Sequence, residues 1–449
     1  MARYLVSLLK PNDQSTAGLM ARGASGTFIL KMVNTGLGFI TAVLLARVLG
    51  IRGYGIYAYA ISWITLLGVI ARLGLDQTIG RYVAVYQQYG DRPRIHGLLR
   101  FSFAVVTGSA VICLLLAGTV AWFCYRESLE MLDALWLSFL LLPVNALMVP
   151  CISTQMGLQK VIPAQVPSLF VQPVGFLFLV GGTWLIFPEE LTPSRVLVLC
   201  VLMTGLSLAL SAWLLRRALM SDVNNISTAK VRPVYEVRAW LKSAIPLMLM
   251  GGMFLANANT DILMLGAMVG PEAAAVYKSA TRGAELVVFS LGIILIPLAP
   301  LIVKLHTSGD WEQLQKLISK SAQLVFVLSV VTACPLIIYG KQFLRLFGYE
   351  FVQGQMALNI LIMGQLVNSA AGISGTILVM CGLERRAAIG LFCGAISNAA
   401  MNMIFIPIWG INGAALATSA STIIWVSTLT YYVIKDLGLN PTILCLHNG

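Results

Sequence analysis

The sequence has few charged residues: lysine, arginine, aspartate and glutamate make up 11% of its 449 residues. Soluble domains carry about 25% charged and about 45–50% apolar residues. This chain is 58% apolar, and its mean hydropathy is +0.85. These values exclude a water-soluble globular enzyme, a disordered protein and a nucleic-acid-binding module. The sequence therefore predicts a helical membrane protein that crosses the bilayer many times.

Residues that bind metals or nucleotides are also scarce. The chain has three histidines and eight cysteines, and no two cysteines have the spacing of a metal site or a redox pair. We interpret the cysteines as small apolar fillers. No GxxxxGK[ST] phosphate-binding loop is present, and no stretch between apolar segments is long enough for a nucleotide-binding domain. We expect no metal, no cofactor, no enzymatic activity and no nucleic-acid partner.

Long apolar segments are what the sequence has in abundance. A bilayer-crossing helix needs roughly 20 predominantly apolar residues, and about 12 such segments can be read. Their approximate limits are 25–49, 54–78, 98–123, 132–157, 161–187, 194–217, 240–268, 280–304, 320–343, 355–381, 386–408 and 411–434. Most of the 30 lysines and arginines fall on one side of these segments if the amino terminus is cytoplasmic. Because cytoplasmic loops are enriched in positive charge, we expect both termini in the cytoplasm.

The sequence has two halves that are related to each other. A polar stretch, 221–238, separates an expected six-helix lobe at 1–220 from a second at 239–449. Three short patterns recur at nearly one offset: Gly50-x6-Tyr57 with Gly270-x6-Tyr277, Gly90-Asp91 with Gly309-Asp310, and Gly157-Leu158-Gln159-Lys160 with Gly382-Leu383-Glu384-Arg385. Because six spans is an even number, the two repeats have the same orientation. We predict an all-α polytopic membrane protein with two parallel six-helix lobes around a central cavity, which is typical of a transporter.

Three stretches carry a resemblance to a known family: LLARVLGIRGYGIYAYA (44–60), IGRYVAVYQQYGD (79–91) and TDILMLGAMVGPEAAAVYKSATR (260–282). They resemble the polysaccharide branch of the multidrug/oligosaccharidyl-lipid/polysaccharide (MOP) exporter superfamily, and Wzx-type flippases in particular. The resemblance implies a protein of the bacterial inner membrane, and we expect a monomer because one chain carries both lobes. Its function would be to move undecaprenyl-pyrophosphate-linked glycan to the outer leaflet for O-antigen, capsule or exopolysaccharide synthesis. A polysaccharide polymerase or chain-length regulator is a further partner that the resemblance allows.

An anionic pyrophosphate needs cationic side chains along its path, because ionisable groups are costly against lipid. Lys31 lies about seven residues into the first span, and either meets the pyrophosphate or extends to the interface. Arg72 and Arg81 lie at the cytoplasmic end of the second span, as an initial phosphate contact or as ordinary positive-inside residues. Arg282 is either a further substrate contact or the partner of Glu285, three residues away on the same helix.

Polar residues inside the spans are the other candidates. Asp261 is the only acid well inside an expected span, and it shares a helix face with Asn257. Asp261 either couples ion movement to transport or forms a structural pair with Arg282 or Lys31, and Asn257 is a candidate substrate contact. Asn398 and Asn402 share a face of a later span. Their amides suit sugar hydroxyls, although amides also join helices inside bilayers.

Two other functions remain open at this point. A cation-coupled drug exporter of the same superfamily would need several acids within its spans, whereas this chain offers Asp261. A non-transporting component of a polysaccharide synthesis complex would use the polar stretch 221–238 as its binding segment. A membrane glycosyltransferase is disfavoured, because the expected outer loops are short and no Asp-x-Asp pair occurs.

Overall fold

The computed structural model describes residues 16–187, 191–221 and 232–443, and within these ranges the chain is helical without any strand. Nine helices in the described ranges are long and apolar enough to cross a membrane, or ten if the bent helix α11 (Pro271–Ser308) counts as one span. The all-α polytopic class is thereby confirmed. The predicted number of about 12 spans is not.

The difference in number arises because two helices each combine two predicted spans. Helix α2 (Thr16–Arg72) and helix α16 (Glu384–Leu437) are 57 and 54 residues long. Each contains one glycine with left-handed backbone, Gly50 at φ 68° and Gly410 at φ 53°. Glycine adopts such angles without the steric cost that a Cβ imposes. Each long element is therefore two helices joined across a glycine kink.

The structure divides into two compact units, and two long helices contribute to both. Unit 1 comprises the described residues of Met1–Thr41 and Ile64–Gly252, and unit 2 comprises Ala42–Trp63 and those of Met253–Gly449. The shared helices are α2 and α10 (Val237–Met268). The expected lobes at 1–220 and 239–449 stay a prediction, and residues 222–231 of the expected linker lie outside the described ranges.

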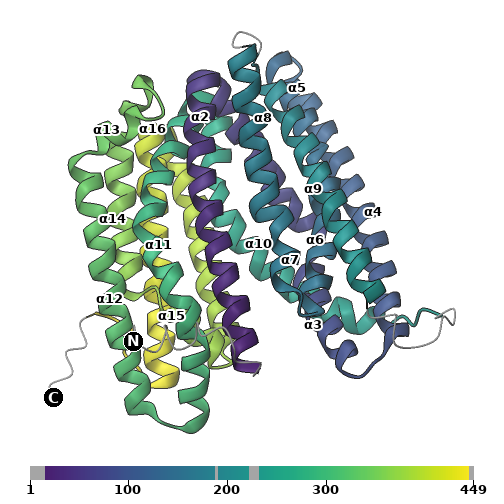
Figure 1. Cartoon of the computed structure of the whole chain (residues 1–449). Coiled ribbons are helices and arrows are strands. Elements are labelled where there is room, and N and C mark those ends of the chain that lie inside the picture. The colour runs from purple at the N-terminus through teal and green to yellow at the C-terminus, as the bar shows by residue number, and fades with distance from the viewer. Residues whose placement is uncertain (1–15, 188–190, 222–231, 444–449) are drawn as a thin grey trace. The chain divides into compact units, whose positions relative to one another are not determined.

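Within unit 1, α6 is the central helix and packs against α3, α4 and α9 (Figure 1). The helices of this unit are α3 (Leu75–Gln88), α4 (Arg92–Tyr125), α5 (Leu129–Phe139), α6 (Leu141–Gly157), α7 (Val161–Val166), the π-helix η1 (Pro167–Val171), α8 (Gln172–Ile186) and α9 (Pro193–Ser221). The π-turn η1 lies in a segment with prolines at 163, 167 and 173. Gln172 donates to the Thr204 hydroxyl at 2.9 Å, so this amide joins α8 to α9.

The start of α10 is fixed to unit 1 by a polar cluster around Glu236. The Glu236 carboxylate accepts from the Tyr86 hydroxyl at 2.9 Å and pairs with Arg94 Nε at 2.7 Å. The Trp240 indole is fully buried and donates to the Tyr86 hydroxyl at 3.1 Å. Burial also raises the pKa of Tyr86, which keeps the hydroxyl protonated as a donor. The cluster ties the beginning of α10 to α3 and α4.

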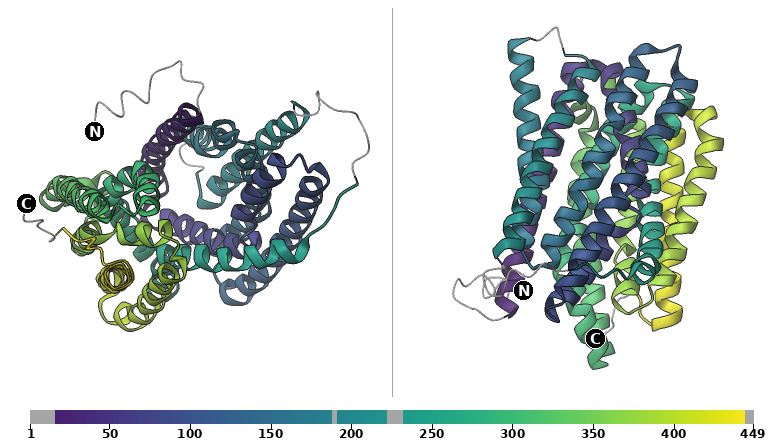
Figure 2. Two further views of the ribbon diagram at one scale, coloured as in Figure 1. Left: turned by 90° about the horizontal axis from the view of Figure 1, so that it is seen from below. Right: turned by 90° about the vertical axis from the view of Figure 1, so that its right-hand side faces the viewer.

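Within unit 2, α14 packs against both α11 and α16, and the helices run side by side as a bundle (Figure 2). The remaining elements of this unit are α12 (Trp311–Ile338), α13 (Gly340–Arg345), the 3-10 helix η4 (Tyr349–Gly354), α14 (Gln355–Ala371) and α15 (Ser374–Met380). A buried apolar cluster formed by α11, α12, α15 and α16 includes Leu298, Ile318 and Ile377.

One of the recurring sequence patterns has the same local structure in both units. Gly90 and Gly309 both have left-handed backbone, at φ 69° and φ 73°. The next residues, Asp91 and Asp310, cap the following helix and accept a hydrogen bond from a backbone N–H three residues on, at 3.2 Å and 3.0 Å. Equal conformation at these two turns supports the repeat inferred from sequence.

Large apolar side chains stay exposed along many helices. On α4, Ile112, Leu116 and Phe123 are 59%, 61% and 76% exposed. Soluble proteins rarely expose apolar surface on this scale in one continuous patch. Such faces are suited to lipid, which agrees with a multi-pass membrane protein.

Gly55 is expected to tolerate no side chain. A Cβ at Gly55 would overlap the backbone carbonyl of Pro271, where α2 touches the start of α11 inside unit 2. Gly55→Ala must push these helices apart, and overpacking of this kind costs about 1–3 kcal/mol. The matched control is Gly36→Ala on the same helix, where nothing lies within 4 Å. Thermal unfolding in detergent should show a lower midpoint for Gly55→Ala only; equal midpoints would contradict the close approach.

Candidate functional site

The best-defined polar site in unit 2 is centred on Asp261. This side chain is 3% exposed and lies on α10, about 10 Å from the end of that helix at Met268 at a rise of 1.5 Å per residue. One carboxylate oxygen accepts from the Asn398 amide at 3.0 Å and also from the Asn402 amide. The other accepts from the Tyr277 hydroxyl at 2.9 Å and the Thr418 hydroxyl at 2.6 Å.

The sequence places these four donors on three further helical segments. Asn398 and Asn402 are one turn apart on the first half of α16, so both amides face the same side of the helix. Thr418 comes after the Gly410 kink, on the second half of α16. Tyr277 is fully buried on α11. The glycine kink thus lets two parts of one long helix contribute to a single buried site.

A carboxylate has about four acceptor positions, and here four neutral groups fill them. Thr418 and Tyr277 are also within 2.8 Å of each other, which closes the network. The amides of Asn398 and Asn402 therefore join helices. This is one of the two roles expected for them from the sequence, the other being contact with sugar hydroxyls. Among the described residues, the Asn402 carbonyl oxygen is buried without a hydrogen-bond partner. No group of three or more His, Cys, Asp or Glu side chains that could hold a metal occurs in the same ranges.

The expected structural pair between Asp261 and Arg282 is not formed. Asp261 has the four neutral partners named above, and Arg282 Nη1 instead binds Glu285 Oε2 at 2.9 Å. The i,i+3 spacing predicted this intrahelical ion pair, which is confirmed. Two tyrosines of α2, Tyr54 and Tyr57, lie within electrostatic range of the guanidinium.

Lys278 lies one helical turn before Arg282 and forms with it a second site on α11. The lysine is partly buried about 10 Å into the helix that begins at Pro271. No acidic side chain of the described ranges forms an ion pair with it. The Arg282 Nε atom is likewise buried without a hydrogen-bond partner in the part of the chain that the structure describes. Glu285 pairs with Arg282, whereas Lys278 has no ion-pair partner among the described residues, so this face of α11 keeps a positive charge.

Lys278 was missed by sequence reasoning, which placed it in an outer loop before the span expected at 280–304. The sequence does contain an indication of this site. Lys278 is four residues before Arg282, so the two cations share a face if both lie on one helix. Tyr277 and Thr418 carried no chemical signal in the sequence, because a single hydroxyl in an apolar segment is common. Their role depends on packing against α10.

The other residues predicted to contact the substrate do not belong to either of these two sites. In unit 1, Lys31 and Arg81 are exposed, and Arg72 Nε donates to the Gly68 carbonyl of its own helix at 2.7 Å. In unit 2, Asn257 does not join the Asp261 network, and its carbonyl oxygen is buried without a partner in the described ranges.

The comparisons with known structures agree on one fold. A multidrug resistance MATE family transporter of the MOP superfamily, inward-facing, has a TM-score of 0.68 at 13% identity, covering 97% of this chain and 98% of that one. The lipid II flippase MurJ, in an inward closed conformation, has a TM-score of 0.61 at 14% identity, covering 92% and 88%. A MOP superfamily transporter from Pyrococcus furiosus has a TM-score of 0.62 at 13% identity, covering 94% and 96%.

The chain therefore has the fold of these MOP superfamily transporters and of the flippase MurJ, and this is the fold that the sequence resemblance implied. The chain also matches the family described as polysaccharide biosynthesis protein over residues 20–306, and the MatE family over residues 246–404. The first match spans more than half of the sequence, and the chain belongs to the polysaccharide biosynthesis protein family. No curated protein sequence gives a significant match.

Proposed function

We propose that this protein is a flippase. It moves undecaprenyl-pyrophosphate-linked oligosaccharide from the cytoplasmic to the outer leaflet of the bacterial inner membrane by alternating access, for synthesis of O-antigen, capsule or exopolysaccharide. The observation that carries the proposal is the charge of the α11 face. Of the two cations, Arg282 pairs with Glu285 and Lys278 has no ion-pair partner among the described residues, so the face keeps a positive charge that an anion can balance. The pyrophosphate of a lipid-linked glycan is such an anion, and guanidinium groups match phosphate oxygens well.

The same charge balance argues against a cationic-drug exporter, the alternative that the MATE neighbours favour. A cationic drug needs unpaired acids within the spans. In unit 2 the buried acid Asp261 is occupied by four neutral donors. The Pyrococcus furiosus transporter named above offers a parallel, since its description reports a binding pocket of reverse polarity that suggests a different function.

Further properties belong to the proposal. The protein would act as a monomer with both termini in the cytoplasm and without hydrolysing ATP. Lys31, Arg72 and Arg81 of unit 1 would contact the pyrophosphate early in transport, and Asn257 would contact the glycan. Asp261 would serve unit 2 structurally, or couple an ion to transport through its surrounding oxygens. A polysaccharide polymerase or chain-length regulator would use the flipped product.

The proposal is tested by the sidedness of lipid-linked oligosaccharide in cells with and without the protein. A lectin or glycosidase applied to intact spheroplasts reports only units in the outer leaflet. Without the protein, full-length units should accumulate beyond the reach of the probe, and the wild-type gene should restore access. Unchanged access together with greater susceptibility to cationic drugs would establish the exporter instead. Unchanged access and susceptibility, with loss of surface glycan, would indicate a non-transporting component.

A further inference from the structure

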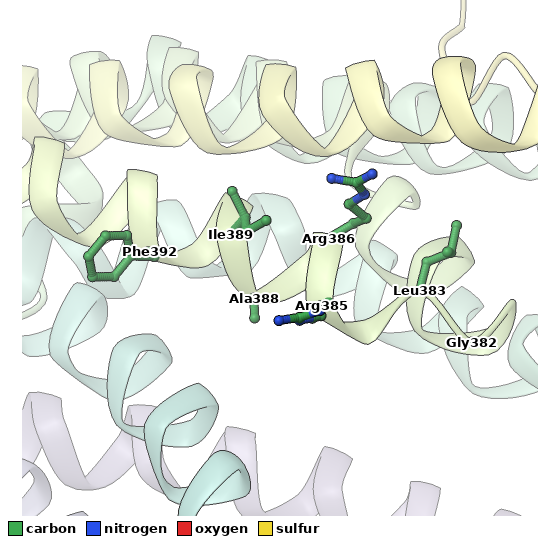
Figure 3. A pocket seen from close by; sticks show the side chains of 7 residues that line it. All are labelled: Gly382, Leu383, Arg385, Arg386, Ala388, Ile389 and Phe392. Carbon is green, nitrogen blue, oxygen red and sulfur yellow. The ribbon is translucent and has the colours of Figure 1, made fainter.

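A pocket of about 720 Å³ lies at the start of α16, within unit 2. Its lining residues come from the turn before the helix and from its first turns: Gly382, Leu383, Arg385, Arg386, Ala388, Ile389 and Phe392 (Figure 3). The volume is in the range of small-molecule sites, roughly 300–1,000 Å³. Its lining combines two guanidinium groups with apolar side chains.

The two neighbouring arginines have different surroundings. Arg386 Nε binds Asp436 Oδ2 at 3.0 Å, and its guanidinium lies over the Tyr432 ring at 4.7 Å from the ring centroid. Its charge is therefore balanced inside the protein. Arg385 is exposed and forms no ion pair with any described residue, and Figure 3 shows it with Ala388 on the opposite side of the helix from Arg386. Glu384 is adjacent in sequence, but consecutive helical residues point about 100° apart.

Apolar side chains continue the pocket along the helix away from Arg385. Ile389, Phe392 and Ile396 follow at i+4, i+7 and i+11, which is one helix face. They are 39%, 48% and 52% exposed. One free cation at the helix end is thus followed by an open apolar strip that runs into the span. This order of groups matches a lipid with one anionic headgroup and apolar chains.

We propose that this pocket binds an anionic glycerophospholipid, with its phosphodiester at Arg385 and an acyl chain along Ile389 and Phe392. Charge selects this occupant. A phosphodiester carries one negative charge, which the single unpaired guanidinium of Arg385 balances. Arg385 supplies parallel N–H donors to the phosphate oxygens. The site is a lipid-binding site of unit 2, and it does not depend on the proposed flippase function.

The test measures lipid binding to the purified full-length protein by native mass spectrometry and by thermal shift in detergent. The probes are phosphatidylglycerol, phosphatidylcholine, glycerol phosphate and farnesyl pyrophosphate. We expect phosphatidylglycerol to bind and to raise the unfolding midpoint, with little effect from the other three. Arg385→Gln should weaken phosphatidylglycerol binding roughly tenfold, which corresponds to the loss of a charge-assisted hydrogen bond. Phe392→Ala should weaken it to a smaller extent.

Two controls separate the site from general charge effects. Lys304→Gln removes another exposed cation of unit 2 and should leave binding unchanged, and Arg385→Lys should retain part of it. Equal binding of phosphatidylcholine, or wild-type affinity in Arg385→Gln, would overturn the proposal. Preferential binding of farnesyl pyrophosphate at Arg385 would also overturn it and would assign the pocket to prenyl-linked lipid. None of these outcomes bears on the sidedness experiment, so the two proposals fail separately.

Discussion

Replacing both Lys278 and Arg282 with glutamine is expected to reduce glycan translocation by about a hundredfold or more. Each cation supplies charge-assisted hydrogen bonds, and the loss of one such contact to a phosphate costs about 1.5–3 kcal/mol, or roughly tenfold to a hundredfold. Glutamine keeps similar length and polarity, so the helix face stays filled. The measurement is the rate at which lipid-linked oligosaccharide becomes accessible to an outer-leaflet probe, at matched amounts of protein in the membrane.

A matched control and an opposing variant make the result specific. Lys341 and Arg345 are exposed cations of unit 2 with the same spacing of four residues, and Lys341→Gln with Arg345→Gln should leave transport unchanged. Glu285→Gln removes the partner of Arg282 and leaves the α11 face more positive, so transport should be kept or increased. If Glu285→Gln reduces transport as severely as Arg282→Gln does, the ion pair itself is required and the cations are structural.

Asp261→Ala is expected to produce the largest loss of stability among single substitutions in unit 2. The change leaves two amides and two hydroxyls buried without their shared acceptor. Interhelical hydrogen bonds in membranes average about 0.6 kcal/mol each, and bonds to charged groups reach about 3 kcal/mol, so a total of roughly 2–4 kcal/mol is expected. Thermal unfolding in detergent and the amount of folded protein in the membrane would both report it.

Asp261→Asn separates a structural role from ion coupling. The amide keeps the shape of the carboxylate and one acceptor oxygen, so the variant should fold with a smaller loss of stability. If Asp261 only joins helices, transport by the folded variant should keep its wild-type dependence on the sodium and proton gradients. If it couples an ion, that dependence should disappear while the unfolding midpoint stays near that of the wild type. Ser369→Ala, which removes a hydroxyl bonded only within its own helix, is the stability control.

Sequence reasoning was strongest where a single chemical requirement acts along the chain. Apolar segments predicted the membrane-crossing helices, and the paired Gly-Asp turns at 90–91 and 309–310 predicted a repeat that reappears as equal backbone conformation. The Arg282–Glu285 pair was predicted from spacing on one helix. Sequence reasoning also placed separate spans on either side of Gly50 and of Gly410, where each long element is two helices joined across a kink. It was weaker where helices meet, because packing decides which side chains contact one another. For a structural role of Asp261, as opposed to ion coupling, it expected a cation as the partner, whereas the structure places four neutral donors there.

Composition and hydropathy were enough to predict the class of this protein. A chain with 58% apolar and 11% charged residues has the composition of a membrane protein, and its long apolar segments predict helices, which satisfy their own backbone groups in lipid. The tertiary structure alone decided which polar groups meet. Asp261, Tyr277, Asn398 and Thr418 lie up to 157 residues apart and come together because three helices of unit 2 pack at one depth. That packing decides which partners a buried acid has, since many polar residues along the chain have the chemistry to serve.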